Sequence, residues 1–205
     1  MRQTPQMPSG TVVAIVLAAG EGRRFRGAQH KLDAEIDGRT LLRRALDAAV
    51  ASRIGPVLVV AGDDTDRHVR TVVPDSVITV VNDHWRDGSA TSLRVGLARA
   101  VELGARRAVI ALGDQPFILA EAWSAVAAAD AAIAVATYAG KRGHPVQLRE
   151  DVWDLLPTSG DEGAKAVMRL RPDLVREIPC RGSADDIDTV EDLHRWQNNS
   201  STSSP

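Results

Sequence analysis

Five short runs of apolar, mostly β-branched residues alternate with stretches of helical periodicity, and no other feature of the chain restricts its fold as much. The runs cover residues 12–18, 56–62, 77–82, 107–114 and 132–138. Each run is apolar on both faces, which is typical of central parallel strands covered by helices on both sides. The alternation therefore predicts an α/β fold in three layers around a mostly parallel sheet.

Length and composition narrow the class further. The chain has 205 residues, which predicts one domain at residues 11–197 between polar tails at 1–10 and 198–205. A net charge of −2 disfavours general attraction to nucleic acid or anionic lipid, and no apolar stretch reaches the ~20 residues that span a bilayer. Cys180 is the only cysteine, so no intrachain disulfide can form. We expect a cytoplasmic protein that binds neither nucleic acid nor membranes.

A glycine-rich loop follows the first apolar run, at the place where open parallel sheets bind ligands. Gly20, Gly22 and Gly27 let the backbone approach an anion closely, and Arg24 and Lys31 add positive charge. The loop has neither the ending of a Walker A loop nor the spacing of a dinucleotide fingerprint. It predicts a cradle for a triphosphate, with an ordinary strand-to-helix turn as the alternative. We expect replacement of Lys31 to weaken nucleotide binding while leaving the fold intact.

Acidic residues follow at two further points of the chain. Asp114 ends the fourth apolar run within the sequence LGDQP, and Asp186 and Asp188 precede a helix that Thr189 is placed to cap. Carboxylates at the carboxyl edge of a sheet suit Mg²⁺ that arrives with phosphates. Capping explains Thr189 but does not require the two preceding aspartates. Asp114, Asp186 and Asp188 are therefore the candidate magnesium ligands, with a capping role of Asp114 as the alternative.

Taken together, these motifs resemble those of the MobA-like NTP transferases, and within them the molybdenum cofactor cytidylyltransferases of the MocA type. The resemblance runs from about residue 12 to residue 196. The matching segments are the loop at 17–31, NDHWRDGSATSLRVGL at 82–97, GDQP at 113–116, GHPVQL at 143–148, GDEGAK at 160–165 and DIDTVEDL at 186–193.

The resemblance implies a fold, a reaction and a set of residues. The fold would be a Rossmann-like α/β/α sandwich of the nucleotide-diphospho-sugar transferase kind. The reaction would be Mg²⁺-dependent transfer of CMP from CTP to molybdopterin with release of pyrophosphate. The catalytic residues would be Arg24, Lys31 and Asp114. The nucleotide would be bound by Leu17, Ala18, Ala19, Gly20, Glu21, Gly22, Arg24, Lys31, Gly88, Ser89, Ser92 and Asp114. The acceptor would be bound by Gln115, Gly143, His144 and Pro145.

The identity of the base depends on a single side chain. The loop reads LAAG, as in the cytidylyl-transferring relatives, whereas the guanylyl-transferring relatives resemble LAGG. The methyl group of Ala19 would narrow the space around the base and favour cytosine. The alternative is that Ala19 only packs beneath the loop.

Departures from the family pattern leave the acceptor open. The loop is one residue longer at Phe25-Arg26-Gly27, His144 stands before Pro145, and Val190 replaces a proline. The alternatives are a sugar or polyol phosphate as acceptor, GTP as donor, and a non-catalytic nucleotide-binding protein that delivers a cofactor. A dehydrogenase is disfavoured by the glycine spacing. The expected partners are an NTP, a phosphorylated pterin and, transiently, a molybdoenzyme. The resemblance assigns no role to residues 160–165.

Overall fold

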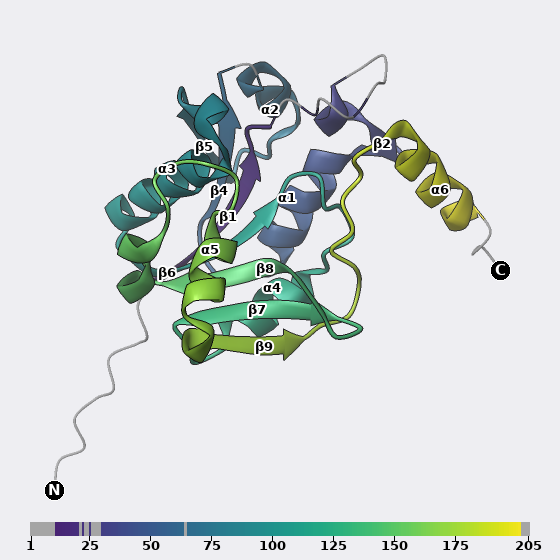
Figure 1. The fold of residues 1–205 in the computed structure, drawn as a ribbon. Coiled ribbons are helices and arrows are strands. Elements are labelled where there is room, and N and C mark those ends of the chain that lie inside the picture. The colour runs from purple at the N-terminus through teal and green to yellow at the C-terminus, as the bar shows by residue number, and fades with distance from the viewer. Residues whose placement is uncertain (1–10, 21, 23–24, 26–29, 64, 202–205) are drawn as a thin grey trace, which may run out of the picture.

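A computed structural model describes residues 11–20, 22, 25, 30–63 and 65–201 of the chain. Its strands are β1 (Thr11–Ala18), β2 (Glu35–Ile36), β3 (Arg39–Thr40), β4 (Val57–Gly62), β5 (Val77–Asn82), β6 (Ala105–Leu112), β7 (Ile133–Tyr138), β8 (Lys141–Arg149) and β9 (Val175–Pro179). Strands β2 and β3 form a separate small hairpin, and the others form one seven-stranded sheet in the order β5-β4-β1-β6-β8-β7-β9 (Figure 1).

The sheet is mostly parallel, as the sequence predicts. Only β8 runs against its neighbours β6 and β7, and all other pairs are parallel. The five apolar runs correspond to β1, β4, β5, β6 and β7. Strand β8 was not predicted, because it begins with lysine, arginine and glycine and has a proline at its centre, and these residues are uncommon inside strands. Only its second half, from Pro145 to Leu148, is buried.

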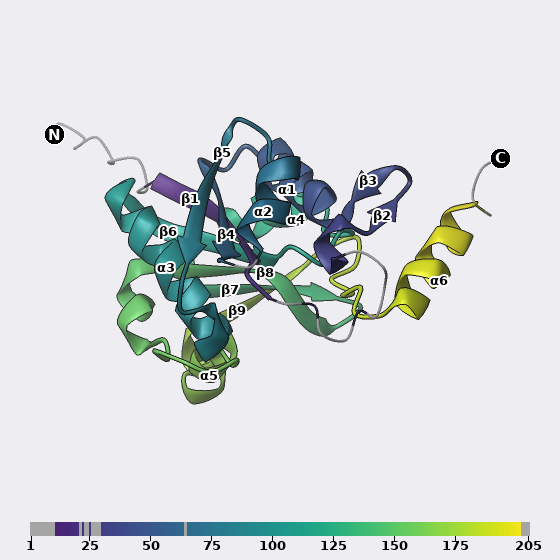
Figure 2. The same ribbon diagram turned by 90° about the horizontal axis from the view of Figure 1, so that it is seen from above.

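Helices cover both faces of the sheet. They are α1 (Leu41–Ala51), α2 (Asp66–Val72), α3 (Ser89–Glu102), α4 (Ala120–Ala127), α5 (Ala164–Leu170) and α6 (Val190–Ser201), with short 3-10 helices η1 (Lys31–Asp33), η2 (Trp85–Asp87), η3 (Glu150–Leu155) and η4 (Pro172–Leu174). Helices α1, α2 and α4 lie on one face and α3 and α5 on the other, while α6 lies to the side near β2 (Figure 2). The fold is a Rossmann-like three-layer α/β/α sandwich. No helix in the described ranges has the length and hydropathy to cross a bilayer.

Strand β1 shows why the apolar runs lack alternation. Ala14 and Val16 pack into the core beneath α1, whereas Val13 and Ile15 pack into the core beneath α3, and all four are 0% exposed. Helix α3 approaches the sheet closely at Gly96, where a Cβ atom would lie 2.9 Å from Cγ2 of Ile15. A strand with helices on both faces must be apolar on both faces.

The order of the strands fixes where a ligand can bind. The chain leads from β1 to β4 and β5 on one side, and then returns to place β6 on the other side of β1. Parallel sheets bind ligands at such a reversal, in the crevice at the carboxyl ends of the strands. The Gly113 amide donates to the Leu17 carbonyl at 2.9 Å, so β1 and β6 are still joined where they reach this crevice.

Candidate active site

A buried lysine lies between two aspartates at the crevice. Lys31, in η1, is only 7% exposed, and its Nζ donates to Oδ2 of Asp114 and to Oδ1 of Asp188, each at 2.7 Å. Burial alone would lower the pKa of Lys31, but the two carboxylates outweigh it and raise the pKa above its usual value. We call these three residues the Lys31 cluster. The sequence did not predict this burial, and it leads us to expect that replacing Lys31 affects stability as well as nucleotide binding.

Main-chain and amide contacts bring the acidic segment before α6 to the end of β6. The Ile187 amide donates to the Asp114 carbonyl at 3.1 Å. Gln115 is 4% exposed, and its Nε2 donates to the Ala184 carbonyl at 2.9 Å and to Oδ1 of Asp186 at 2.6 Å. Loss of hydration and the charge of Asp114 raise the pKa of Asp186. Asp186 is therefore held by Gln115, whereas Asp188 joins the Lys31 cluster.

The Lys31 cluster has the donor atoms that a hard divalent cation requires. Oδ1 of Asp114 is buried and accepts no hydrogen bond. Mg²⁺ bound with a nucleotide usually takes one or two protein carboxylates and completes its shell with phosphate oxygens and water. Within the described ranges, no group of three His, Cys, Asp or Glu side chains is arranged to hold a metal ion. The two carboxylates of the cluster fit a cation that is carried in by a triphosphate.

The glycine-rich loop is described in part. Leu17, Ala18, Ala19, Gly20 and Gly22 are within the described residues, whereas Glu21, Arg24 and Gly27 lie outside them. Ala19 is 6% exposed, so its methyl group is buried. Gly22 has φ +64°, and a Cβ atom there would lie 2.8 Å from Cβ of Lys31. The absence of a side chain at Gly22 thus lets the loop pass directly beside Lys31.

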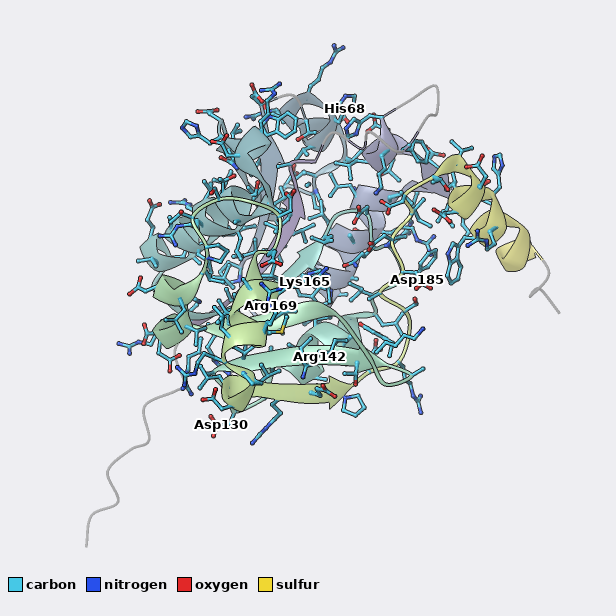
Figure 3. All side chains as sticks on the ribbon, in the orientation of Figure 1. His68, Asp130, Arg142, Lys165, Arg169 and Asp185 are labelled. Atoms are coloured by element: carbon cyan, nitrogen blue, oxygen red, sulfur yellow. The ribbon has the colours of Figure 1, made fainter. Side chains whose placement is uncertain are left out.

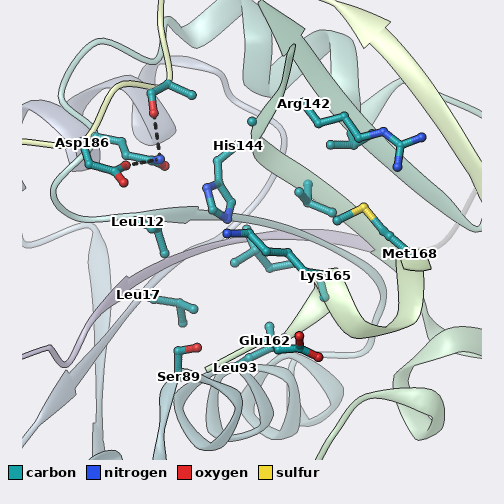
Figure 4. A pocket seen from close by; sticks show the side chains of 18 of the residues that line it. Leu17, Ser89, Leu93, Leu112, Arg142, His144, Glu162, Lys165, Met168 and Asp186 are labelled. Atoms are coloured by element: carbon teal, nitrogen blue, oxygen red, sulfur yellow. Dashed lines mark hydrogen bonds between the residues drawn. The ribbon is translucent and has the colours of Figure 1, made fainter. Parts of the chain in front are cut away.

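Gln115, which follows Asp114, and Asp186 line a cleft of about 810 Å³ (Figure 4). Its apolar lining includes Leu17 from β1, Leu93 from α3, Leu112 from β6, Val146 from β8 and Met168 from α5. The charged side chains around it include Lys141, Arg142, Glu162, Lys165, Arg169, Asp185 and Asp186. Arg142, Lys165 and Arg169 project from the half of the molecule built on β8 and α5 (Figure 3). Of the predicted acceptor residues, Gln115, Gly143 and His144 line the cleft and Pro145 is buried.

The predicted nucleotide-binding serines occupy different positions. Ser89 lines the cleft, and its amide donates to Oδ1 of Asp161 at 3.1 Å. Ser92 is 3% exposed and accepts a hydrogen bond from Nδ2 of Asn82 at 2.9 Å. Ser92 therefore ties the start of α3 to the end of β5, whereas Ser89 faces the cleft.

Gly88, which precedes α3, touches the backbone of Gly160. A Cβ atom on Gly88, where φ is +107°, would lie 2.4 Å from the Gly160 carbonyl oxygen. We expect Gly88→Ala to lower the free energy of unfolding by about 2–4 kcal/mol, because it adds a backbone clash to an unfavourable φ. Gly160→Ala is the matched control. Gly160 also has a positive φ, +83°, but has open space, so about 1–2 kcal/mol is expected. Equal losses in urea unfolding would contradict the role assigned to the contact.

His144 is a neutral histidine in the cleft wall. Its carbonyl accepts a hydrogen bond from the Tyr138 hydroxyl at 2.7 Å, which fixes the backbone at this point. Burial lowers the pKa of the ring to about 4, the charge of Asp114 opposes this shift, and the charge of Lys165 adds to it. His144 thus lies within electrostatic reach of both the Lys31 cluster and α5.

This pKa predicts how stability depends on pH. An unfolded histidine takes up a proton below about pH 6.5, whereas folded His144 stays neutral down to about pH 4. The free energy of unfolding therefore decreases as the pH falls from 6.5 to 4. Above pH 6.5 this group causes no further change with pH. We expect His144 to contribute about one proton to the uptake on unfolding in the window from pH 6.5 to 4, a contribution that is absent in His144→Asn. Urea unfolding at several pH values measures this, and parallel pH profiles for the two proteins would contradict it.

Sequence reasoning missed several residues of the cleft. Lys165, Asp161 and Glu162 all line it, and they come from the segment 160–165, to which no role was assigned. The signal was present, since GDEGAK is one of the segments that resemble the family. The sequence did not indicate that this segment lies close to His144 in β8 (Figure 4).

These features occur together at one edge of the sheet. A glycine-rich loop, a buried lysine bridging two aspartates and an adjoining cleft lie at the carboxyl ends of β1 and β6. Positive charge beside carboxylates that could bind a metal suits the handling of a triphosphate, and the cleft leaves room for a second substrate. The fold and the site are those of a nucleotidyltransferase.

The chain belongs to the family with the MobA-like NTP transferase domain, whose model matches residues 14–177. Two relatives match over most of their length. The nicotine blue oxidoreductase of Paenarthrobacter nicotinovorans is 28% identical, with 90% of this chain and 95% of the relative covered. The purine catabolism protein PucB of Bacillus subtilis is 29% identical, with 91% and 96% covered. The resemblance stated from the motifs is confirmed at the level of the family.

Solved structures agree with this assignment. Rv0371c of Mycobacterium tuberculosis is 29% identical with a TM-score of 0.80, over 94% of this chain and 100% of that chain. Its manganese complex is 28% identical with a TM-score of 0.76, over 92% and 98%. A nucleotidyl transferase of Methanothermobacter is 20% identical with a TM-score of 0.80, over 95% and 99%, and shares the fold.

Proposed function

We propose that the chain transfers CMP from CTP to the phosphate of molybdopterin and releases pyrophosphate. The observation that carries this proposal is the cleft of about 810 Å³ with largely apolar walls, whose lining includes Gln115, the residue that follows Asp114 of the Lys31 cluster. The volume accommodates a substrate larger than a small polyol phosphate, and apolar walls favour a flat heteroaromatic body. The cluster supplies the charges that a triphosphate requires, so the two substrates would meet at the carboxyl ends of β1 and β6.

The residues of the chain would act by position and charge. Lys31 would leave the carboxylates to bind the phosphates of CTP, and Arg24 and the loop amides would complete the cradle. Asp114 and Asp188 would hold magnesium, which when bound neutralises charge on the triphosphate and on the departing pyrophosphate. The manganese complex of Rv0371c supports the use of a divalent metal in this family. The acceptor phosphate is already ionised, so the reaction requires no separate nucleophile from the protein.

Ala19 is the basis for proposing CTP. Its methyl group is buried at the start of the loop, where it takes up space that a glycine would leave open. A difference of one methyl group is worth about 1–3 kcal/mol at most, so Ala19→Gly should erode a preference for CTP over GTP without reversing it. A wild-type preference for GTP would overturn the choice of base and leave the transferase assignment standing.

The decisive experiment measures pyrophosphate release. Purified protein is incubated with each NTP and Mg²⁺. Each mixture is tested without acceptor, with metal-free molybdopterin, and with molybdopterin that carries molybdenum. We expect release only with CTP and acceptor together, and a new cytidylylated pterin by mass spectrometry. Release with a sugar or polyol phosphate in place of molybdopterin would replace the proposed acceptor. Binding of CTP without any turnover would favour a cofactor-delivery protein.

One comparison favours a second candidate. The relative from Paenarthrobacter nicotinovorans, which spans 90% of this chain, is called an oxidoreductase. A hydride-transferring enzyme would bind a nicotinamide cofactor, whose charge does not require a lysine between two carboxylates. Titration with NADH and NADPH, followed by fluorescence and by absorbance at the nicotinamide band, distinguishes the two. Saturable binding with oxidation of the cofactor in the presence of a quinone or dye would favour this candidate.

A further inference from the structure

Lys165 and His144 point toward one another across the cleft (Figure 4). Lys165 comes from α5 and His144 from β8, and both line the cleft. Among the described residues, the Lys165 ammonium has no hydrogen bond or ion pair, although it lies close enough to affect the charge state of His144. A cation and a neutral imidazole thus face the same space.

The nearby carboxylates are held by other groups. Glu162 forms a two-point ion pair with Arg169, with distances of 2.6 and 2.8 Å. Asp186 accepts from Gln115 at 2.6 Å, and Asp114 accepts from Lys31 at 2.7 Å. None of these acids forms an ion pair with Lys165, so its positive charge in the cleft is not balanced by an ion pair among the described residues. An anionic ligand would supply that balance.

The imidazole of His144 is suited to contact the same anion. The ring is neutral at physiological pH because burial lowers its pKa to about 4. A neutral imidazole offers one N–H donor without repelling a neighbouring ammonium. The Tyr138 hydroxyl holds the His144 carbonyl at 2.7 Å, so the ring projects from a fixed backbone.

We propose that Lys165 and His144 form the subsite for the phosphate of the acceptor, which gives the segment 160–165 its function. This inference rests on the proposed function. His144 senses the charges of both Asp114 and Lys165, so a phosphate at this subsite lies on the side of the cleft that faces the Lys31 cluster. Lys165 would offset the repulsion between the acceptor phosphate and the triphosphate, which otherwise opposes their approach.

The transfer is balanced with the phosphate in this place. An ionised oxygen of the acceptor phosphate forms a bond to the α-phosphorus of CTP. The bond from the α-phosphorus to the oxygen bridging the β-phosphorus breaks, and pyrophosphate leaves with the electron pair. No proton has to be moved, so Lys165 and His144 bind and orient the phosphate and do not act as acid or base.

The surroundings of the subsite also restrict the body of the acceptor. Leu17, Leu93, Leu112 and Met168 line the cleft on different sides of Lys165 (Figure 4). These four side chains provide contact area for a flat ring face, and the polar side chains of the cleft, such as Ser89 and Gln115, lie elsewhere in its lining. The subsite therefore favours a phosphate monoester whose body presents a flat ring face to these walls over a sugar or polyol phosphate.

Steady-state kinetics test the assignment when the wild type transfers CMP to molybdopterin. Lys165→Met should raise the KM for the acceptor at least tenfold and leave the KM for CTP within twofold, and Lys165→Arg should restore part of the loss. Lys141→Met is the matched control, because Lys141 is an exposed lysine of the same cleft that does not affect His144. An unchanged acceptor KM in Lys165→Met, or an equal rise in Lys141→Met, would overturn the subsite.

A binding experiment keeps the subsite testable if the wild type does not transfer CMP. Inorganic phosphate is titrated into the protein, and the ring signals of His144 are followed by NMR, with assignment by His144→Gln. The subsite predicts a saturable shift in the wild type and in Lys141→Met that is lost in Lys165→Met. No shift in the wild type, or the same shift in Lys165→Met, would overturn the subsite whatever reaction the protein performs. Failure of transfer with an intact shift would overturn only the proposed function.

Discussion

Asp114→Asn is expected to lower turnover at least ~10²-fold, the effect of losing one pre-organised charged group at a reaction centre. The substitution keeps the size of the side chain and removes its charge. Stability should change by less than about 1 kcal/mol, because Asp114 is 23% exposed and Lys31 keeps its contact with Asp188. Steady-state pyrophosphate release at saturating Mg²⁺, with a urea unfolding curve, measures both effects.

Two further aspartates make this experiment specific. Asp188→Asn should show a similar loss of turnover, since Asp188 shares the contact with Lys31. Asp186→Asn should lose much less, because that carboxylate accepts a hydrogen bond from Gln115 and is not one of the two that contact Lys31. Asp185→Asn, in the same segment and lining the cleft, is the control for a general loss of negative charge. A stable Asp114→Asn protein with normal turnover would make Asp114 a structural residue and remove the proposed metal site.

Lys31→Met is expected to affect both stability and catalysis. Methionine fills a similar volume but leaves the carboxylates of Asp114 and Asp188 facing each other without a cation. Removing one partner of a buried ion pair costs about 3–5 kcal/mol, and the partial exposure of both aspartates reduces this to about 2–3 kcal/mol. The kcat/KM should fall at least tenfold, or roughly 1.4 kcal/mol, because a phosphate-binding charge is lost.

A metal titration distinguishes this explanation from simple misfolding. In the wild type a divalent cation would have to compete with the Lys31 ammonium for the carboxylates, whereas in Lys31→Met it would relieve their repulsion. Mn²⁺ should therefore raise the melting temperature more in Lys31→Met than in the wild type. Lys141→Met, an exposed lysine, should shift stability by no more than about 0.5 kcal/mol and show the wild-type response. Equal responses to Mn²⁺ in Lys31→Met and the wild type would contradict the competition.

The sequence predicts most strands of the sheet, and the strands that it misses lack an apolar pattern of their own. Strands such as β1 and β4 are continuous apolar runs, so their central place in a parallel sheet can be predicted from their residues. Strand β8 carries four polar or glycine residues before Pro145, and its pairing with β6 and β7 is set by tertiary contacts. Hairpin β2–β3 has two-residue strands, which are too short to leave a periodic signal.

The candidate site was predicted residue by residue but not in its arrangement. The motifs identified Lys31, Asp114 and Asp188, and the strand-end rule indicated the edge where they meet. They did not reveal that Lys31 contacts the aspartates directly, because a salt bridge across 157 positions leaves no local pattern. Nor did they assign Lys165, whose role depends on the distant His144. Arg24 and Glu21 lie outside the described residues, so their parts in nucleotide binding stay predictions.

The Lys31 cluster joins residues that leave the ribosome at very different times. Lys31 and Asp188 are 157 positions apart, which corresponds to about 8–30 s of synthesis at 5–20 residues per second. During that interval a nascent chain can pair Lys31 with Asp114 at most, and the segment that carries Asp188 can dock onto the end of β6 only afterwards. Contacts of such long range form late in folding. The ability to hold a cation and a triphosphate would thus arise only when nearly the whole chain has emerged, so incomplete chains would not sequester nucleotide.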